Sequence, residues 1–391
     1  MEKPLRILSV VNVPWDPRLG AARVWIELTD EWRKAGHHVE KFCLTDAFRE
    51  PASSSAHAAL RLLGFPQRAA KFIRENAGRF DVIDALIGTL PFSKKSLGFR
   101  GLLVARSVGL YHLYEKFERM AAQRWAPASK GKLLSRPFYW LFYRRGRASS
   151  ATSLRYCDLL NLPNSDELDC VRNEMKSDKP AIVQPYGLRP ERARAQAQVA
   201  GPSEIRAQEK KIVFIGMWSQ RKGARDWGAI IREVRARVPA SRFLFLGTMT
   251  ANENVWRDLE MTPADFIEIV PQFDPDELPR LLADCTVGAF PSYVEGFGIA
   301  VVEQLAAGLP TVAYDAPGPR DILRGNLAQL LVPPGNAHRF AEVLSDLLVD
   351  NFERYEQLSL QSLETSAKFS WPEIARDTSA EYRKYLSDAN A

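Results

Sequence analysis

The sequence predicts an α/β protein built from two doubly wound parallel-sheet domains. At 391 residues the chain is longer than one hydrophobic core usually supports, so two domains are expected. In the first half, short apolar runs typical of buried strands alternate with helical segments, and after residue 210 the same alternation begins again. Strands that alternate with helices are typical of parallel sheets whose two faces are covered by helices.

The first half of the chain supplies the strands of the first domain. A helix is expected over about 21–34, because Gly36 follows it and suits a left-handed C-terminal cap. A further strand is expected to begin at about Val39. The other predicted strands occupy 5–10, 81–86, 102–106 and 157–162.

The second half repeats this order after a segment of different composition. Residues 189–209 are rich in Ala, Arg, Gln and Glu and lack a clear apolar period, so we expect a linker there. The expected domains are therefore 1–188 and 210–371. Strands are predicted over 211–216, 243–247, 266–271, 286–290, 312–314 and 330–332, and helices over 275–283, 299–307, 337–348 and 374–386.

One stretch, FPSYVEGFGIAVVEQLAAGLPTVAYDAPGPRD at 290–321, has the features of a ligand site. A strand, a glycine-containing turn, a helix and a second strand follow one another, so N–H groups at the helix N-terminus can face an anion such as phosphate. Glu295 lies in the turn and Glu303 roughly one turn into the helix. Carboxylates repel phosphate but accept hydrogen bonds from sugar hydroxyls. The site therefore suits a ligand that joins phosphate to sugar, although the two carboxylates alone fit a turn residue and a solvated helix residue better.

The spacing E-x7-E, with Pro-Ser before it, Gly-Phe-Gly after the first Glu and A-x-G-x-P-x-V behind, resembles the signature of glycosyltransferase family 4. The resemblance implies a GT-B fold, in which two Rossmann-like parallel-sheet domains face a cleft. It also implies that the C-terminal helix, 372–391, packs back onto the N-terminal domain. The activity that the resemblance implies is transfer of a sugar from a nucleotide sugar with retention of anomeric configuration.

The resemblance assigns roles to the residues of the signature. In such proteins the second Glu, here Glu303, holds the ribose hydroxyls. The donor sugar is held by the first Glu and the backbone amides after it, here Glu295, Gly296, Phe297 and Gly298.

The loop after the strand at 211–216 is similar to the family's G-R…K-G element, whose two cations clamp the donor phosphates. Gly216 and Lys222 match this element, whereas Met217 stands where the family has Arg, and Arg221 is expected to supply that charge. Together with Glu295, both cations are expected to be catalytic. Gln272 falls where the family's backbone borders the nucleotide base.

Two loops of the first domain are the expected acceptor side. Gly20 and Arg23 lie in and after the first loop, which resembles the family's glycine-containing loop over the donor diphosphate, although one glycine alone also fits a plain turn. Ser107 and Val108 end a later strand, and Val108 stands where many members have a His. His112 substitutes for that His only if the loop coils.

Charge is distributed unevenly along the chain. Residues 1–190 carry 31 Lys/Arg against 19 Asp/Glu, and residues 191–391 carry 22 against 28. The first half is therefore expected to face any anionic partner, and the absence of a recognisable zinc finger, RNP motif or basic zipper makes nucleic acid the weakest candidate. Residues 119–157 hold nine Lys/Arg, no Asp or Glu, and an aromatic cluster over 138–143. These aromatics fit either an anionic membrane surface or the domain core.

The cellular setting predicted from the sequence is the cytoplasm, with peripheral association at the inner face of the membrane. No apolar run is long enough to span a bilayer, and the N-terminal stretch predicts a strand and not a signal peptide. The four cysteines show no metal-ligand spacing, which fits reduced thiols.

The function predicted from the sequence is transfer of a sugar from a nucleoside-diphosphate sugar to the hydroxyl of a glycan or lipid-linked acceptor. No cofactor and no obligatory metal are expected, because no Asp-x-Asp directly follows an apolar strand. Two alternatives remain: a nucleotide-sugar-binding protein with impaired catalysis, and a GT-B epimerase that acts on the nucleotide sugar alone.

Overall fold

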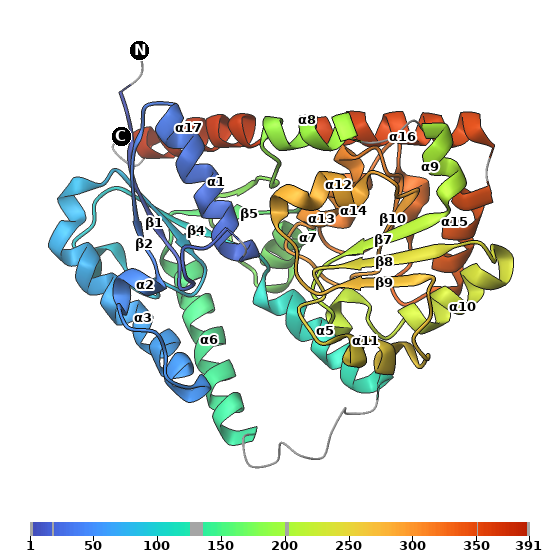
Figure 1. Cartoon of the computed structure of the whole chain (residues 1–391). Coiled ribbons are helices and arrows are strands. Elements are labelled where there is room, and N and C mark those ends of the chain that lie inside the picture. The colour runs from blue at the N-terminus through green and yellow to red at the C-terminus, as the bar shows by residue number, and fades with distance from the viewer. Residues whose placement is uncertain (1–2, 18, 126–135, 200–202, 350, 389–391) are drawn as a thin grey trace. The chain divides into compact units, whose positions relative to one another are not determined.

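The computed structural model describes residues 3–17, 19–125, 136–199, 203–349 and 351–388, with the backbone alone for 136–143. The chain divides into two compact units (Figure 1). Unit 1 is Met1–Pro185 with Trp371–Ala391, and unit 2 is Tyr186–Ser370. Each unit contains a six-stranded sheet whose pairings are all parallel. The two parallel sheets with flanking helices confirm the predicted α/β class.

The sheet of unit 1 has the order β2-β1-β3-β4-β5-β6. Its central strands β3 and β4 are buried along almost their whole length, because helices cover both faces of a parallel sheet. This is why they occur in the sequence as unbroken apolar runs. The strands are β1 (Arg6–Val10), β2 (His38–Phe42), β3 (Val82–Leu86), β4 (Leu102–Arg106), β5 (Leu159–Leu162) and β6 (Ala181–Val183).

The helices of unit 1 bury one apolar face each. In α1 (Gly20–Lys34), Trp25, Leu28 and Trp32 recur at helical spacing and are fully buried. The longest helix, α3 (Ser55–Asn76), was not predicted, and it contains Pro66. The remaining helices are α2 (Leu44–Ala47), η1 (Ala77–Arg79), α4 (Lys94–Leu97), α5 (Tyr111–Arg124), α6 (Arg136–Tyr156), α7 (Ser165–Asp169), η3 (Cys170–Glu174) and α17 (Trp371–Asp388).

The C-terminal helix α17 packs against α1 within unit 1 (Figure 1). The indole N–H of Trp32 donates to the carbonyl of Ala375 at 3.0 Å, and the rings of Trp32 and Tyr382 lie 6.0 Å apart. The Tyr382 hydroxyl reaches the sheet, where it donates to Asp84 Oδ2 at 2.6 Å. The last segment of the chain is thus part of the first unit's core.

The sheet of unit 2 has the order β12-β11-β10-β7-β8-β9. Trp227 packs edge-on against three phenylalanines of β7 and β8, namely Phe214, Phe243 and Phe245. This aromatic cluster anchors the helix that follows β7. The strands are β7 (Lys211–Ile215), β8 (Arg242–Leu246), β9 (Ile267–Val270), β10 (Val287–Phe290), β11 (Thr311–Tyr314) and β12 (Leu331–Val332).

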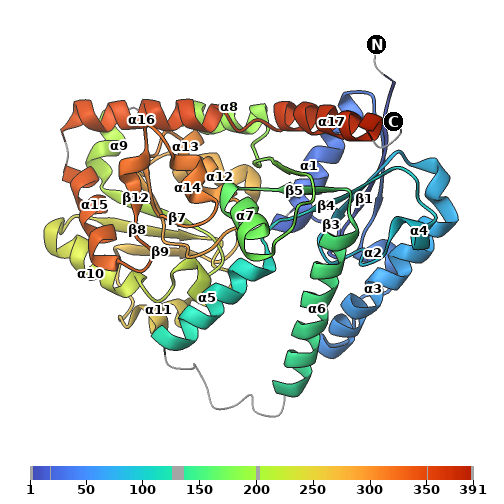
Figure 2. The ribbon, with the colours of Figure 1, turned by 180° about the vertical axis from the view of Figure 1, so that it is seen from behind.

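The helices of unit 2 cover its sheet, and Figure 2 shows α15 beside α10, with which it packs. Their bounds are α8 (Pro190–Val199), α9 (Ser203–Glu209), η4 (Gln220–Lys222), α10 (Trp227–Arg237), α11 (Asn252–Leu259), η5 (Pro275–Glu277), α12 (Leu278–Leu282), α13 (Ile299–Ala306), α14 (Pro319–Leu323), η6 (Ala328–Leu330), α15 (Ala337–Val349) and α16 (Phe352–Ala367).

The segment 189–209, expected to be a linker, forms helices α8 and α9 of unit 2. Helix α8 packs on α12 and α13, and α9 packs on α16. Two of the buried side chains of these helices are polar: Gln196 is fully buried, and Arg206 is buried with Nη1 donating to the carbonyl of Ala307 at 2.6 Å. A search for apolar periodicity cannot detect a buried face made with such residues.

Candidate functional site

In unit 2, the predicted donor-site residues lie in loops that follow β7 and β10. These strands are neighbours in the sheet and run parallel, so their carboxyl ends meet at the same edge. The loop after β7 contains Arg221 and Lys222, and the loop after β10 contains Glu295. Ligands of doubly wound sheets bind at this edge.

The structure brings Glu295, Arg221 and Lys222 into direct contact. Lys222 Nζ and Arg221 Nη1 each lie 2.8 Å from Glu295 Oε1. The hydroxyl of Ser292 donates to the same oxygen, and Lys222 Nζ also lies 4.7 Å from the centre of the Phe290 ring. One oxygen of a buried carboxylate therefore accepts from two cations and a hydroxyl.

Burial and charge act in opposite directions on this cluster. Burial alone would raise the pKa of Glu295, but the charges of Lys222 and Arg221 and the hydrogen bonds from Lys222 and Ser292 hold it below its usual value. For Lys222, burial lowers the pKa, and the nearby Arg221 adds to this effect while Glu295 opposes it. Two cations facing one ionised carboxylate leave an excess of positive charge, which suits an anionic ligand.

Close backbone contacts hold the two loops together. The N–H of Tyr293 donates to the carbonyl of Arg221 at 2.9 Å, and Arg221 Nη1 donates to the carbonyl of Val294 at 2.9 Å. Gly223 adopts a φ of +80°, and a Cβ atom there would lie 2.3 Å from the carbonyl oxygen of Pro291. Glycine is thus required for the approach that places the two cations beside Glu295.

Asp226 stabilises the loop of Glu295 through hydrogen bonds. It is buried, and its Oδ2 accepts hydrogen bonds from the hydroxyls of Tyr293 at 2.6 Å and Tyr314 at 2.7 Å. Because Tyr293 belongs to the loop of Glu295, the bond ties that loop to the start of α10. We did not predict Asp226, Ser292 or the two tyrosines. For Ser292, the spacing of three residues before Glu295 was the available signal.

The turn from Gly296 to Gly298 leads into helix α13. Gly298 adopts a φ of +96° immediately before the helix begins. The ring of Phe297 is buried between Tyr186 at 5.5 Å and Phe369 at 5.4 Å. This packing fixes the turn, and the first N–H groups of α13, which lack acceptors within a helix, lie directly after it.

Glu303 lies on α13 and is 6% exposed. Its Oε1 is 3.9 Å from Nη1 of Arg192 on α8, and Arg192 Nη2 donates to the carbonyl of Pro275 at 2.6 Å. Glu303, the residue predicted to hold the ribose, therefore faces the guanidinium group of Arg192. We missed Arg192 because its segment was interpreted as a linker.

Two other predicted donor residues of unit 2, Gly216 and Gln272, follow β7 and β9. Gly216 follows β7 with a φ of +154°, and a Cβ atom there would contact the Lys222 side chain at 3.8 Å. Met217 is 53% exposed, so its position carries an accessible thioether in place of a cation. Gln272 is exposed after β9, which β8 separates from β7 in the sheet.

In unit 1, the predicted donor-binding residue Gly20 and the three predicted acceptor-side residues, Arg23, Ser107 and Val108, also follow strand ends. Gly20 is the first residue of α1, and Arg23 Nε lies 3.9 Å from Glu27 Oε1 in the same helix. Ser107 is buried and Val108 half-buried after β4. His112 does not occupy the position of Val108, because it is the second residue of α5.

A buried acid, Glu167, fixes the loop that contains Ser107 and Val108. Its Oε1 accepts from the N–H of Leu110 at 2.9 Å, and its side chain also hydrogen-bonds with Ser107. Burial raises the pKa of Glu167 to about 8, although these two hydrogen bonds oppose the shift. Glu167 was not predicted; its place three residues after the helix-capping Asn164 was the only signal.

The basic aromatic stretch 119–157 is only partly described. Residues 126–135 and the side chains of 136–143, which include the aromatic cluster, lie outside the described residues. Arg144, Arg145 and Arg147 are exposed on α6, and Arg147 Nη1 lies 3.3 Å from Glu115 Oε1. In the part of the chain that the structure describes, no helix is both long and apolar enough to cross a bilayer.

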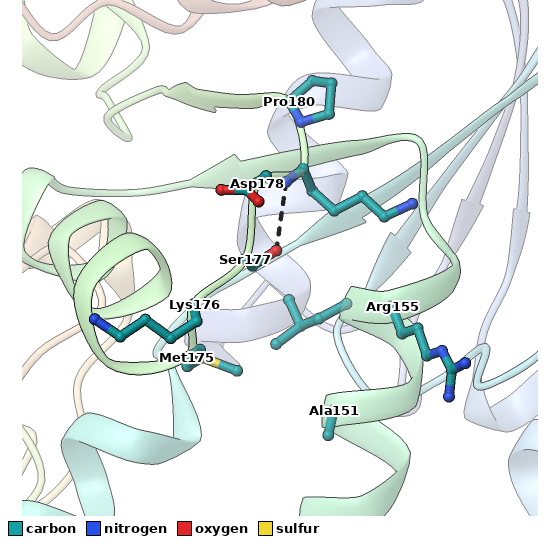
Figure 3. A pocket seen from close by; sticks show the side chains of 9 residues that line it. Ala151, Arg155, Met175, Lys176, Ser177, Asp178 and Pro180 are labelled. Atoms are coloured by element: carbon teal, nitrogen blue, oxygen red, sulfur yellow. Dashed lines mark hydrogen bonds between the residues drawn. The ribbon is translucent and has the colours of Figure 1, made fainter.

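Figure 3 shows a separate pocket of about 580 Å³ in unit 1. It lies where α6 ends and β6 begins, at the amino ends of the strands, and none of the predicted site residues lines it. Its walls combine apolar and basic side chains: Ala151, Leu154, Arg155, Met175, Lys176, Ser177, Asp178, Lys179 and Pro180.

No group of three or more His, Cys, Asp or Glu side chains among the described residues is arranged to hold a metal ion.

Comparison with known families and proteins finds a family match within unit 2. Residues 209–350 match the family model described as "Glycosyl transferases group 1". A D-inositol 3-phosphate glycosyltransferase of Nocardioides sp. is 34% identical over 118 residues, which are 30% of this chain and 26% of that protein. The chain thus matches about a quarter of that curated relative's length. An MMP alpha-(1->4)-mannosyltransferase of Mycolicibacterium hassiacum is 26% identical over 365 residues, 88% of this chain and 83% of the relative.

Solved structures share the fold of the whole chain. A sucrose-phosphate synthase from Thermosynechococcus elongatus aligns with a TM-score of 0.73 at 18% identity, covering 98% of this chain and 100% of that one. Anabaena HepE in complex with UDP and glucose aligns with a TM-score of 0.64 at 15% identity, covering 97% and 100%. The fold is therefore GT-B, and residues 209–350 are the part of the chain that the group 1 family model matches.

Proposed function

We propose that the protein is a glycosyltransferase that transfers a sugar from a nucleoside-diphosphate sugar to an acceptor hydroxyl, with retention of anomeric configuration. The observation that carries the proposal is the cluster of Glu295, Arg221 and Lys222 beside the start of α13. It offers two cations to a diphosphate and one carboxylate to sugar hydroxyls. The group 1 domain and the GT-B fold support the same activity.

The two cations would act on the leaving group. Negative charge grows on the departing phosphate as the bond to the sugar breaks, and cations fixed in a buried site stabilise that charge more than they stabilise the intact donor. Arg221 and Lys222 are held by the loop contacts around Gly223, so little reorganisation is needed. By analogy with family 4, the departing phosphate oxygen takes the acceptor proton on the same face, and no protein nucleophile is required.

Glu303 would bind the ribose of the donor nucleotide. Its carboxylate is largely buried, and Arg192 lies 3.9 Å away. That distance leaves the carboxylate able to accept hydrogen bonds from two adjacent hydroxyls, which are the donors a ribose presents. Gln272 and the exposed Met217 would lie toward the base and the phosphates.

The acceptor would be a glycan or a lipid-linked molecule that meets the loops after β1 and β4. Ser107 and Val108 lie at the second of these loops, and Gly20 and Arg23 follow the first. The side chain of Val108 cannot donate or accept a hydrogen bond, so the acceptor or sugar contact made by the His side chain in many family members would be absent here. The basic character of residues 1–190 suits an acceptor that carries phosphate.

The proposal is tested with purified full-length protein and a panel of UDP-, GDP- and ADP-hexoses. A true donor should raise the melting temperature by mass action, and released nucleoside diphosphate should accumulate when an acceptor is added. Lys222→Ala should lower turnover by about tenfold or more, because it removes a charge-assisted contact worth about 1.5–3 kcal/mol. Failure of every nucleotide sugar to bind would overturn the proposal.

The same assay separates the two alternatives. A binding protein with impaired catalysis would show the thermal shift without release of nucleoside diphosphate. An epimerase would convert the sugar of the donor with no acceptor present, which NMR of the reaction mixture would detect.

A further inference from the structure

Glu295 forms ion pairs with both of the cations that a donor diphosphate would bind. Its Oε1 lies 2.8 Å from Lys222 Nζ and 2.8 Å from Arg221 Nη1. The side chains of the three residues are 10%, 13% and 23% exposed, in the order Glu295, Lys222, Arg221. The cluster is therefore a largely buried ion triad in which both cations already have a charged partner.

A diphosphate that binds these cations must weaken their contacts with Glu295. Once the cations turn to phosphate, Oε1 keeps the hydroxyl of Ser292 but loses two charge-assisted hydrogen bonds. A buried carboxylate with missing donors is unfavourable, as is a carboxylate close to a phosphate. Binding of a bare nucleoside diphosphate is therefore opposed by Glu295.

An attached sugar changes this balance. Among the described residues, the hydrogen bonds to the Glu295 side chain are accepted by Oε1, so Oε2 can accept from sugar hydroxyls. Hydroxyl donors on a carboxylate would compensate for the cations that turn to the phosphate. The sugar of the intact donor would thus replace the hydrogen bonds that Glu295 loses, whereas the free nucleoside diphosphate has no sugar to replace them.

We infer that Glu295 is a specificity-determining residue that competes with the diphosphate for Lys222 and Arg221, so that the site favours the intact nucleotide sugar over the free nucleoside diphosphate. This inference rests on the proposed function. Its consequence is that Glu295 promotes release of the product nucleotide after transfer. A carboxylate that only contacts the sugar would leave the affinity for the product unchanged.

The test is calorimetric titration of the full-length protein with the nucleotide sugar found in the donor screen and with its free nucleoside diphosphate. Wild type should bind the nucleotide sugar more tightly. Glu295→Gln keeps the shape of the side chain and removes its charge, so it should bind the free diphosphate about tenfold more tightly than wild type does. The preference for the intact donor should shrink accordingly. Glu295→Ala, which removes the side chain's hydrogen bonds as well, should shift the free diphosphate in the same direction.

Glu303→Gln is the matched control, because it removes one carboxylate from the same unit without touching the two cations. It should weaken the binding of both nucleotides, because Glu303 is the proposed ribose ligand, and it should not tighten the binding of the free diphosphate. If both Glu295 variants bind the free diphosphate no more tightly than wild type, the competition is disproved while the proposed function stands. If wild type and variants bind no nucleotide sugar and no nucleoside diphosphate, the proposed function itself is wrong.

Discussion

Glu167 lies beside the loop after β4 and is fully buried, with its Oε1 bonded to the N–H of Leu110. Its pKa of about 8 means that the folded protein prefers the protonated acid. The unfolded chain releases this proton near the ordinary value of 4.5. The folded state therefore binds more protons between these two values, and the stability that Glu167 contributes is lost as the pH rises from about 4.5 to about 8.

Replacing Glu167 by Gln should remove this pH dependence. Each pKa unit corresponds to about 1.4 kcal/mol, so between pH 5 and pH 8.5 wild type should lose on the order of 3–4 kcal/mol of unfolding free energy relative to Glu167→Gln. Urea unfolding of both proteins across this range measures the difference. Parallel pH profiles for the two proteins would show that Glu167 is ionised in the folded state at neutral pH.

Under the proposed function, Arg221 and Lys222 would supply the positive charge that other nucleotide-dependent enzymes obtain from a metal ion. Because both cations belong to the protein, transfer of the sugar should proceed at an unchanged rate in EDTA. Product formation with and without chelator is the measurement. Complete loss of activity in EDTA, restored by Mg²⁺ or Mn²⁺, would contradict this assignment of the phosphate site.

At the scale of elements, α17 is attached to the sheet of unit 1 by a buried polar network. Arg106 and Asp84 form an ion pair at 2.8 Å, with side chains 1% and 0% exposed. The Tyr382 hydroxyl donates to Asp84 and lies 2.8 Å from Arg106 Nη2, and burial raises the pKa of this phenol well above 10. The network joins the last helix to β3 and β4.

Tyr382→Phe should lower the unfolding free energy by about 1–3 kcal/mol, because Asp84 loses a donor in a buried site. Asp84→Asn should cost about 3–5 kcal/mol, because it leaves the charge of Arg106 without its counter-ion. Denaturant unfolding followed by circular dichroism is the measurement. Tyr385→Phe on the same helix is the control, since its hydroxyl makes no hydrogen bond with any residue that the structure describes, and it should change stability little. Equal losses for Tyr382→Phe and Tyr385→Phe would refute the network's role.

The elements that the sequence predicted well are those whose burial is apolar. The central strands, such as β4 and β10, are nearly continuous hydrophobic runs, so their positions were predicted within a residue or two. Helices α8 and α9 were missed because residues such as Gln196 and Arg206 form part of their buried faces.

The residues of the candidate site also divide into those that local sequence patterns predicted and those that they missed. Motif spacing singled out Glu295, Lys222 and Arg221, which the structure brings into contact. Asp226 and Arg192 were not predicted, because each acts through a partner far away in the sequence. Asp226 meets Tyr314 across 88 residues, and Arg192 meets Glu303 from a helix interpreted as a linker. Such contacts depend on how strands and helices are arranged in space, which local patterns do not encode.

At the scale of the whole molecule, the charge asymmetry of the chain remains to be assigned a role. The 31 basic residues of 1–190 exceed its 19 acidic residues, and nine of them fall in the acid-free stretch 119–157. Of these, Arg144, Arg145 and Arg147 are exposed on α6. Exposed cations on one helix can face an anionic membrane surface. A protein bound there would meet a lipid-linked acceptor in the membrane that holds it.

We predict that the protein binds anionic vesicles at low salt and releases them at high salt, because the attraction is screened within about a Debye length. Each basic side chain near an anionic leaflet contributes about 1 kcal/mol, so replacing Arg144, Arg145 and Arg147 together by Gln should weaken binding roughly a hundredfold. Co-sedimentation with phosphatidylserine-containing and with neutral vesicles measures this.

The matched control removes the same charge from exposed arginines of unit 2, in a variant that combines Arg257→Gln, Arg280→Gln and Arg324→Gln. If α6 is the contact surface, this control variant should sediment with anionic vesicles nearly as wild type does. If both triple variants lose binding equally, the attraction depends on net charge and not on α6. If wild type stays in the supernatant with anionic vesicles at low salt, the protein does not use this surface, and its acceptor is a molecule that reaches it from solution.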